Sequence, residues 1–301
     1  MADTDSIDRF ILEHTRVRGE IVHLQDTWQA VLARYDYPEN VKKILGEAFA
    51  ACALLSATIK YDGSLILQIR GDGPLHLLVV QATSAGTLRG LARWSGDVPA
   101  QNLQSIFGNG QMVMTIEPPK GEPYQGIIAL QGEHIKDAIE SYFIQSEQLN
   151  TRLWLASDEK KCAGFLLQEL PLSENEKNVS TGIDQNELNN NWQHAVHLAS
   201  TLQDNELLTL PTSEILHRLF HESDVRLFES APLSFRCSCS QARIEKMILS
   251  LGQNEANEII KDQGKIQVDC EFCNAQYNFD SAGVEKLFSD DRDSTSTQTL
   301  H

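Results

Sequence analysis

Apolar residues in the N-terminal part of the chain recur with the spacing of strands in some segments and of helices in others. Alternation over residues 16–24 predicts a strand, and apolar positions three or four residues apart predict a short helix from Asp26 and a longer one after Pro38. Turns rich in glycine, serine and proline then separate a run of alternating segments. Strands are expected there at residues 64–70, 76–83, 87–94, 111–117, 124–130, 151–156 and 163–170. With a further helix at 133–149, the pattern predicts mixed sheets covered by helices.

The pattern changes in the next segment, residues 173–230. Its first part, 173–191, is dense in Asn, Glu, Ser and Gln, which indicates a linker or a marginal helix. Apolar positions that include Trp192 and Val196 then form a stripe on a polar background, and another helix is expected near Ser213. The segment has apolar faces but too little mass for its own core. We expect a metastable helical linker that leans on a neighbour, the small C-terminal domain.

Residues 231–288 form a separate, smaller pattern. Two helical stretches end at Gly252 and Gly264, alternating residues then predict a β-hairpin, and an apolar stripe predicts a closing helix. Residues 289–301 are polar and low in complexity, so we expect a disordered tail. A domain of this size gains only about 3–5 kcal/mol from its own core. A further source of stability is therefore expected.

The composition excludes several classes of protein. A hydrophobic content of 41% is ample for a core, whereas a formal net charge of −17 disfavours nucleic acid or an anionic membrane as a partner. No stretch approaches the roughly 20 apolar residues of a membrane span, and the acidic N-terminus lacks the features of a signal peptide. We therefore expect a cytoplasmic protein in a reducing environment, where clustered cysteines indicate metal or redox chemistry.

Four of the six cysteines fall in two close pairs, Cys237-Ser238-Cys239 and Cys270-Glu271-Phe272-Cys273. Two such pairs complete the tetrahedral set of four sulfur ligands that zinc favours. The softness of thiolates also admits an iron–sulfur cluster or Cu(I). We expect one zinc ion per chain. The sequence thus predicts an α+β protein with a large N-terminal mixed α/β domain (1–172), a helical linker and a small C-terminal four-cysteine zinc domain.

The same sulfur atoms have a second possible use. Zinc ribbons usually contain C-x-x-C twice, and here one pair is C-x-C, which leaves less room for an undistorted coordination loop. Each pair could also close into a local disulfide. A static structural zinc and a metal site that doubles as a thiol switch therefore both remain open. The two other cysteines, Cys52 and Cys162, are isolated in apolar segments and are expected in the core.

No constellation of residues indicates an enzyme. The chain contains neither H-E-x-x-H nor the G-x-S-x-G nucleophile elbow. Gly71-Asp72-Gly73-Pro74 and Gly108-Asn109-Gly110 lack the surroundings of a phosphate-binding loop and are interpreted as tight turns. We expect a protein without catalytic residues.

The flanks of the four cysteines are informative as well. The segments Arg236-Cys237-Ser238-Cys239-Ser240 and Cys270-Glu271-Phe272-Cys273-Asn274, followed by Tyr277, resemble the C-terminal signature of the bacterial redox-regulated 33 kDa heat-shock chaperone family. Weaker similarities occur in the family's order along nearly the whole chain, at Val17–Glu20, Gly71–Leu75, Leu88–Gly90, Tyr124–Gly126, Ser146–Leu149 and Arg218–Glu222. Asn150 departs from the proline of the family pattern, but it touches no metal ligand.

This resemblance implies an ATP-independent holdase that is inactive while reduced and zinc-bound. Peroxide or hypochlorite, often with heat, then converts the four ligands into the disulfides Cys237–Cys239 and Cys270–Cys273 and releases the zinc. The linker unfolds, the protein forms a homodimer, and exposed apolar surface holds unfolding client proteins. The expected partners are clients and a second copy, with no nucleic acid and no membrane.

Two other functions compete with the chaperone. A zinc-ribbon module that binds nucleic acid would need a basic face, which the acidic composition disfavours. A thiol–disulfide oxidoreductase would need an exposed C-x-x-C pair of low pKa in a thioredoxin-like setting. Binding of DNA or RNA at low salt would support the first, and turnover of a disulfide substrate the second.

Overall fold

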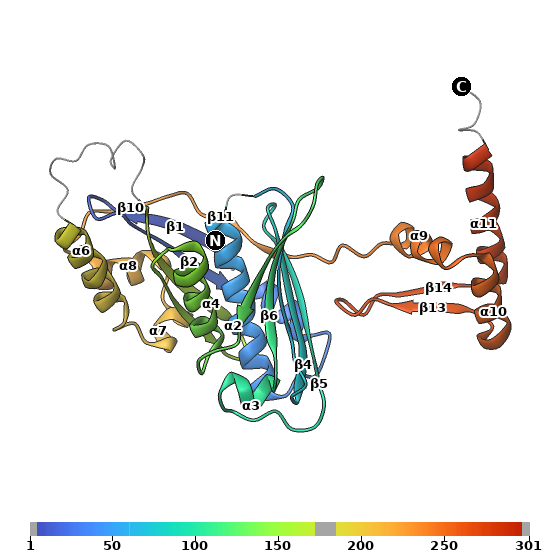
Figure 1. The fold of residues 1–301 in the computed structure, drawn as a ribbon, viewed down its shortest axis with the longest axis horizontal. Helices are drawn as coiled ribbons and strands as arrows, with labels where there is room; N and C mark the ends of the chain where they lie inside the picture. Colours follow the sequence, from blue (N-terminus) through green and yellow to red (C-terminus); the bar gives the residue numbers. More distant parts are fainter. Residues whose placement is uncertain (1–4, 60, 172–184, 297–301) are drawn as a thin grey trace. The chain divides into compact units, whose positions relative to one another are not determined.

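Two sheets and a long helix between them form the larger of two units in this computed structural model, which describes residues 5–59, 61–171 and 185–296 (Figure 1). The chain divides into Met1–Arg236 and Cys237–His301. The expected fold class, a large N-terminal α/β body and a small four-cysteine unit, is confirmed. None of the helices in the described residues is long and apolar enough to cross a membrane.

The first sheet has the strand order β10-β1-β2-β9-β8, and β11 pairs with β1 beside β10. Its strands are β1 (Ser6–Leu12), β2 (Val17–Leu24), β8 (Thr151–Ser157), β9 (Cys162–Glu169), β10 (Val225–Leu227) and β11 (Ala231–Pro232). All pairs in this sheet are antiparallel. Strands from the two ends of the unit thus meet on β1.

The second sheet has the strand order β12-β5-β4-β3-β6-β7. Its strands are β3 (Ser64–Arg70), β4 (Leu75–Thr83), β5 (Thr87–Trp94), β6 (Gln111–Glu117), β7 (Tyr124–Ala129) and β12 (Ser234–Phe235). The four longer pairings are antiparallel, and β12 joins β5 in parallel. The short β12 ends two residues before the first clustered cysteine.

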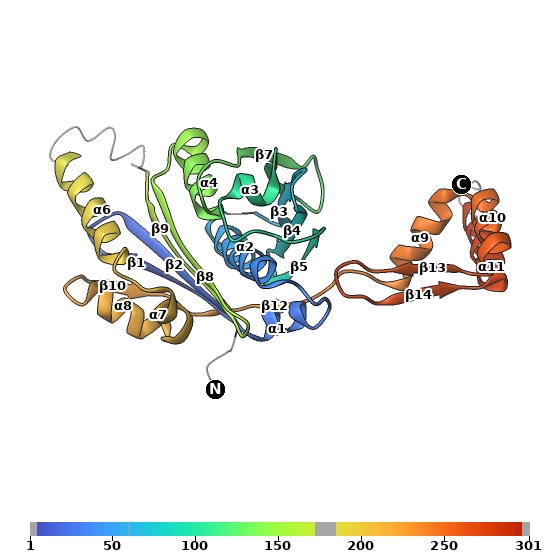
Figure 2. The same ribbon diagram turned by 90° about the horizontal axis from the view of Figure 1, so that it is seen from below.

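Helix α2 (Glu39–Thr58) lies between the two sheets and forms the centre of the core (Figure 2). Its residues are buried on nearly all sides, because it contacts β2, β8 and β9 of one sheet and β3, β4 and β5 of the other. The backbone approaches β8 so closely that a Cβ at Gly46 would lie 2.0 Å from Ser157 Oγ. Smaller elements complete this part: α1 (Asp26–Leu32), α3 (Leu103–Phe107), α4 (Ile135–Tyr142) and the π-helix η1 (Phe143–Glu147).

Three helices cover the other face of the first sheet, away from α2 (Figure 2): α6 (Gln185–Ala199), α7 (Asp204–Thr209) and α8 (Thr212–Phe220). Their buried side chains, among them Trp192 and Ile215, pack with Phe10 and Phe165 of the sheet. The Phe10 and Phe220 rings lie 6.1 Å apart. The segment does need a neighbour, as predicted, but the expectation that this neighbour is the C-terminal domain is wrong. Periodicity identifies an apolar face and does not identify its partner.

The small unit contains α9 (Gln241–Leu251), α10 (Gln253–Gln263), β13 (Ile266–Asp269), β14 (Gln276–Phe279) and α11 (Ser281–Ser296). Among its residues with described side chains, six are buried in its core: Ile248, Ala256, Ile266, Phe279, Val284 and Phe288. It begins at Cys237, whereas the sequence pattern suggested residue 231, and β11 and β12, which precede it, pair with strands of the larger unit. At the other end α11 continues to Ser296, beyond the tail boundary expected at 289, and residues 297–301 lie outside the described part.

Candidate metal centre

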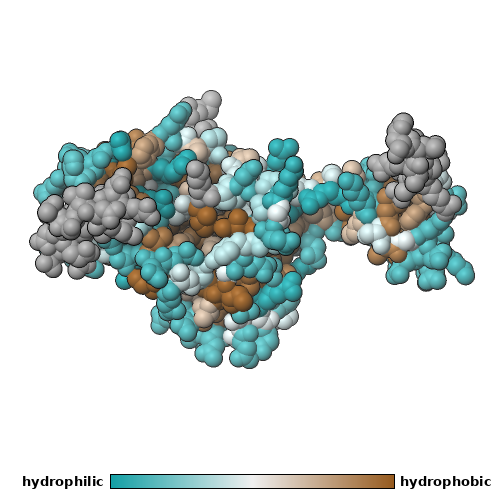
Figure 3. Space-filling model, turned by 45° about the horizontal axis from the view of Figure 1, so that its top comes forward, coloured by the Kyte–Doolittle hydropathy of each residue, from teal (hydrophilic) through white to brown (hydrophobic). Residues whose placement is uncertain are grey.

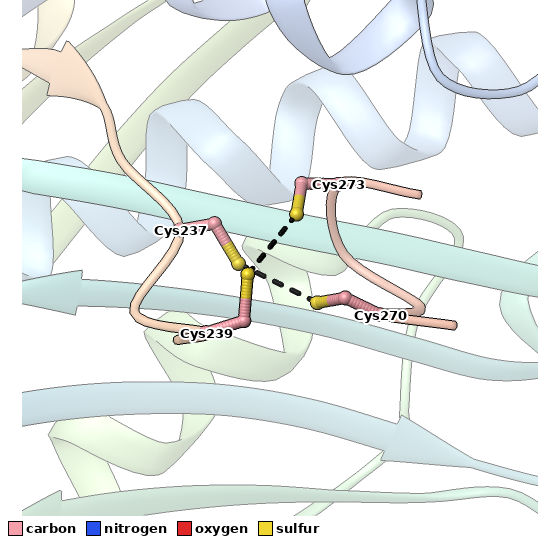
Figure 4. Close-up of side chains that lie close together, drawn as sticks. All are labelled: Cys237, Cys239, Cys270 and Cys273. Atoms are coloured by element: carbon pink, nitrogen blue, oxygen red, sulfur yellow. Dashed lines mark hydrogen bonds between the residues drawn. The ribbon is translucent and has the colours of Figure 1, made fainter. Parts of the chain in front are cut away.

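The four clustered cysteines point their sulfur atoms at one another (Figure 4). All four Sγ atoms lie within 4.8 Å of each other, with 3.6 Å between Cys237 and Cys270 and 3.3 Å between Cys239 and Cys273. Tetrahedral zinc with Zn–S bonds of about 2.3 Å places its sulfur ligands about 3.8 Å apart, whereas a disulfide needs about 2.05 Å. The sulfurs are thus free thiols at a spacing that fits a metal ion such as zinc.

The C-x-x-C pair occupies a tight turn between β13 and β14. The amide of Asn274 donates to Cys270 O at 2.8 Å, and the amide of Cys270 donates to Ala275 O at 2.9 Å. Asn274 has a φ of 58°, in the left-handed region that asparagine tolerates better than most residues. The turn brings Cys270 and Cys273 onto the same side, so both sulfurs reach the cluster.

The C-x-C pair precedes α9, and the first turn of that helix fixes its loop. Ser240 caps α9 by accepting from the amide of Arg243. The Arg243 side chain reaches back, and its Nη1 donates to Ser238 O at 3.1 Å and to Ser238 Oγ at 2.8 Å. A guanidinium and a helix N-terminus, both positive, therefore adjoin the loop that carries Cys237 and Cys239, whose sulfurs become negative once a metal binds.

Burial raises the pKa of Cys270, and it raises the pKa of Cys273 to about 12. The hydrogen bond with Cys239 likewise raises the pKa of the Tyr277 hydroxyl to about 12. Without a cation the cluster therefore favours thiols, because closely spaced thiolates repel each other in a partly buried site. A divalent metal has to displace these protons, so its apparent affinity falls as pH falls.

Cys52 on α2 and Cys162 on β9 lie in the core, as the sequence predicts, and both are fully buried. Burial raises the pKa of Cys52 to about 12 and that of Cys162 well above its ordinary value. The thiolate is the reactive form of cysteine. Neither residue is therefore poised to react, and neither reaches the cluster.

Sequence reasoning missed the residues that support the cluster. Arg243 and Ser240 were visible only as the start of a helix after C-x-C, and Asn274 only as a residue after C-x-x-C. The available signals were a serine N-cap followed three residues later by a long polar side chain, and an asparagine where a tight turn needs a positive φ.

Replacing Arg243 by Met should weaken zinc binding about tenfold, the lower end of the loss typical for residues that orient metal ligands. The substitution keeps the aliphatic stem but removes both bonds to Ser238 and the positive charge. Competition with a chromophoric chelator measures the change in affinity. Lys246→Met, at an exposed position of the same helix, is the matched control and should bind zinc as the parent does. Equal affinity of both variants would contradict the supporting role of Arg243.

The fold and the thiol cluster define a protein with a two-sheet α/β body and a small C-terminal four-cysteine unit. The sequence model described as Hsp33 protein matches residues 5–280. The 33 kDa chaperonin of Nitrosococcus oceani is 48% identical over 301 residues, which cover all of both chains. That of Pseudomonas savastanoi pv. phaseolicola is 42% identical over all of this chain and 99% of its own. The chain belongs to the Hsp33 family.

A solved structure has the same fold. The crystal structure of the 33 kDa chaperonin from Thermotoga maritima superposes with a TM-score of 0.79 at 22% sequence identity. The match covers 96% of this chain and 99% of the other. The fold is therefore shared at low sequence identity.

Proposed function

We propose that this protein is a redox-regulated, ATP-independent chaperone that binds unfolding client proteins and prevents their aggregation. Membership of a family whose relatives are named chaperonins supports the chaperone function. The observation that carries the regulation is the cluster of four thiols within 4.8 Å in a unit of its own. In this proposal the reduced, zinc-bound protein is inactive and the oxidised protein is active.

A comparison of free energies favours a bound metal over the apolar core as the main source of stability of the small unit. Its core consists of six buried side chains, and domains of this size gain about 3–5 kcal/mol from such cores. Structural zinc contributes about 10–16 kcal/mol in comparable motifs. Zinc is therefore proposed as the bound ion, held by Cys237, Cys239, Cys270 and Cys273. Its loss would unfold the unit.

Oxidation is the proposed trigger of zinc release. One hydrogen peroxide takes two electrons from a pair of these sulfurs and two protons from solvent, because metal-bound sulfurs are deprotonated, and leaves a disulfide and two waters. Two peroxides convert the cluster to Cys237–Cys239 and Cys270–Cys273, the pairing that the family resemblance implies. The short distances between Cys237 and Cys270 and between Cys239 and Cys273 suggest crossed pairs as the competitor. Mass mapping of the oxidised protein distinguishes them, because only crossed pairs join peptides from the two motifs.

Release of the helices α6 to α8 is the proposed route from the cluster to client binding. They cover an apolar sheet face formed by Phe10, Phe165 and neighbouring side chains. Between α8 and the small unit the chain pairs with the two sheets through β10, β11 and β12, each two or three residues long, and Leu233 and Phe235 pack against the core. Such short strands resist detachment weakly. The uncovered face would add to the apolar patches already visible on the larger unit (Figure 3).

Several partners follow from this proposal. Clients bind to the uncovered apolar surface, and two oxidised copies form a homodimer. The net charge of −17 supports the absence of nucleic acid and anionic membrane among the partners. We place the protein in the cytoplasm, whose reducing conditions keep the four thiols available for zinc.

Aggregation suppression tests the proposed function. Chemically unfolded citrate synthase is diluted, without ATP, into the reduced zinc-loaded protein or into the same protein after treatment with peroxide. Light scattering should fall only with the oxidised sample. Equal suppression by both samples would refute redox control, and suppression by neither would refute the chaperone.

A Cys52→Ser, Cys162→Ser double variant should keep the switch. Burying a hydroxyl in place of each thiol costs about 1–3 kcal/mol of the free energy of unfolding, but neither residue belongs to the cluster. Peroxide should therefore still release zinc and activate the variant, provided that circular dichroism shows it folded. Loss of activation in a folded variant would place part of the switch in the core.

A further inference from the structure

The larger unit has a cavity of about 760 Å³ that the thiol chemistry does not use. It lies on the α2 side of the first sheet, between β1, β2, the C-terminal end of α2 and residues 228–232. This size is typical of pockets for small molecules. Its apolar lining includes Ile11, Ala57, Leu170, Phe228 and Pro232.

The polar lining is concentrated on β1 and β2. Arg9 is exposed, and its side chain makes no hydrogen bond or ion pair with the described residues, although its backbone carbonyl accepts from the Phe228 amide at 2.8 Å. Arg18 donates only to neutral acceptors, Gln168 Oε1 and Thr58 O, and its buried Nε has no partner in the same part of the chain. An unsatisfied buried donor costs about 1–3 kcal/mol. Two guanidinium groups without a hydrogen-bonded carboxylate therefore border one apolar pocket.

Glu20 on β2 lines the same pocket and is the cross-strand neighbour of Arg9 on β1. It is 2% exposed, and its Oε2 accepts from Thr58 Oγ1 at 2.9 Å. Burial raises its pKa to about 7, although the Thr58 hydroxyl and the charges of Arg18 and Arg9 act in the opposite direction. The protonated carboxyl adds a hydrogen-bond donor to the pocket. The remaining charged group is Glu229, exposed on the segment that forms the opposite wall.

We propose that this pocket binds a small amphipathic carboxylate, with its head group beside Arg9 and Arg18 and its chain against the apolar lining. Of the two kinds of contact, the charge-assisted hydrogen bonds from guanidinium to carboxylate are the stronger. A slight rotation of Arg18 would also give its Nε an acceptor. The protein as a whole is acidic, with a net charge of −17, so two guanidinium groups beside one pocket are a local departure from its overall negative charge.

Octanoate is the probe, and octanamide, with the same chain and no charge, is its control. Binding to the reduced, zinc-loaded full chain is measured by calorimetry. Octanoate should bind saturably and more tightly than octanamide, and Arg9→Gln should weaken octanoate about fivefold. Arg70→Gln, an exposed arginine on β3, is the matched control and should change nothing. Equal affinity for the two probes, equal effects of the two variants, or no saturable binding would each overturn the proposal.

A pH series separates this site from general apolar binding. Glu20 as a carboxylate repels the head group and as a carboxyl donates to it, while guanidinium groups stay charged over this range. Octanoate affinity should therefore rise up to about tenfold from pH 8 to pH 6, as Glu20 becomes protonated. Glu20→Gln should bind at pH 8 as the parent binds at pH 6, with no further pH dependence. The same pH dependence in both proteins would contradict the role of Glu20.

One consequence rests on the proposed function. Residues 228–232, the connection after β10 together with β11, form a wall of the pocket, in the region that the proposed activation detaches. A ligand that needs this wall favours the docked state, and oxidation should weaken its binding by the reciprocity of linkage. If octanoate binds the reduced and the oxidised protein equally tightly, the proposed binding site stands. Only its coupling to the redox switch is then refuted.

Discussion

Replacing Cys270 by Ser should abolish tight zinc binding and unfold the small unit while the larger unit stays folded. A hydroxyl is a poor substitute for thiolate at a tetrahedral sulfur site, and apparent zinc binding free energies of about 10–16 kcal/mol exceed the roughly 3–5 kcal/mol available from a small core. Zinc content measures the first effect. Amide NMR spectra measure the second, because signals of residues 237–288 should collapse to the dispersion of an unfolded chain.

Cys52→Ser is the matched control for that experiment. It makes the same chemical change in the core of α2, outside the cluster, so it should lower the stability of the larger unit and keep one zinc per chain. The two variants should therefore show opposite patterns. Stoichiometric, tight zinc in Cys270→Ser would contradict the assignment of the four ligands.

Replacing Phe220 by Ala should activate the chaperone without any oxidant. Phe220 is 1% exposed and packs against Phe10 beneath α8, and such truncations cost about 3–5 kcal/mol. The lost free energy weakens the packing of α8 against the sheet. This is the contact that the proposed activation breaks. The reduced, zinc-loaded variant should suppress aggregation, and proteases should cleave it within residues 185–230.

His217→Ala is the control, because it also truncates a ring side chain of α8 to alanine. His217 is exposed, and its ring lies outside the apolar cluster. It should remain inactive until oxidised. If Phe220→Ala becomes protease-sensitive at α8 and still shows no activity while reduced, the covered sheet face is not the client surface.

The sequence predicted the elements whose signals are local. The stripe after Pro38 forms α2, and the four cysteines whose spacing predicted a shared site lie in one cluster. Both follow from short-range patterns, helical periodicity and ligand spacing. The apolar stripe near Trp192 was recognised for the same reason.

The missed features depend on contacts between distant parts of the chain. Strand β1 was not predicted, and β10 to β12 are too short to show alternation and exist because they pair with β1 and β5. The helix expected from Asp26 is capped from a distance, because the Asp5 carboxylate accepts from the amides of Gln25, Asp26 and Thr27. Asp5 lies far from this helix in sequence, so no local pattern could have indicated the cap.

A single time course tests the central claim, that the four clustered thiols are both the zinc site and the switch. The reduced protein is treated with peroxide, and free thiols, released zinc and aggregation suppression are measured in the same samples. We expect one zinc to be released as four thiols are lost, and activity to follow zinc release with no earlier phase. Full activity while zinc remains bound and the four thiols remain reduced would contradict it.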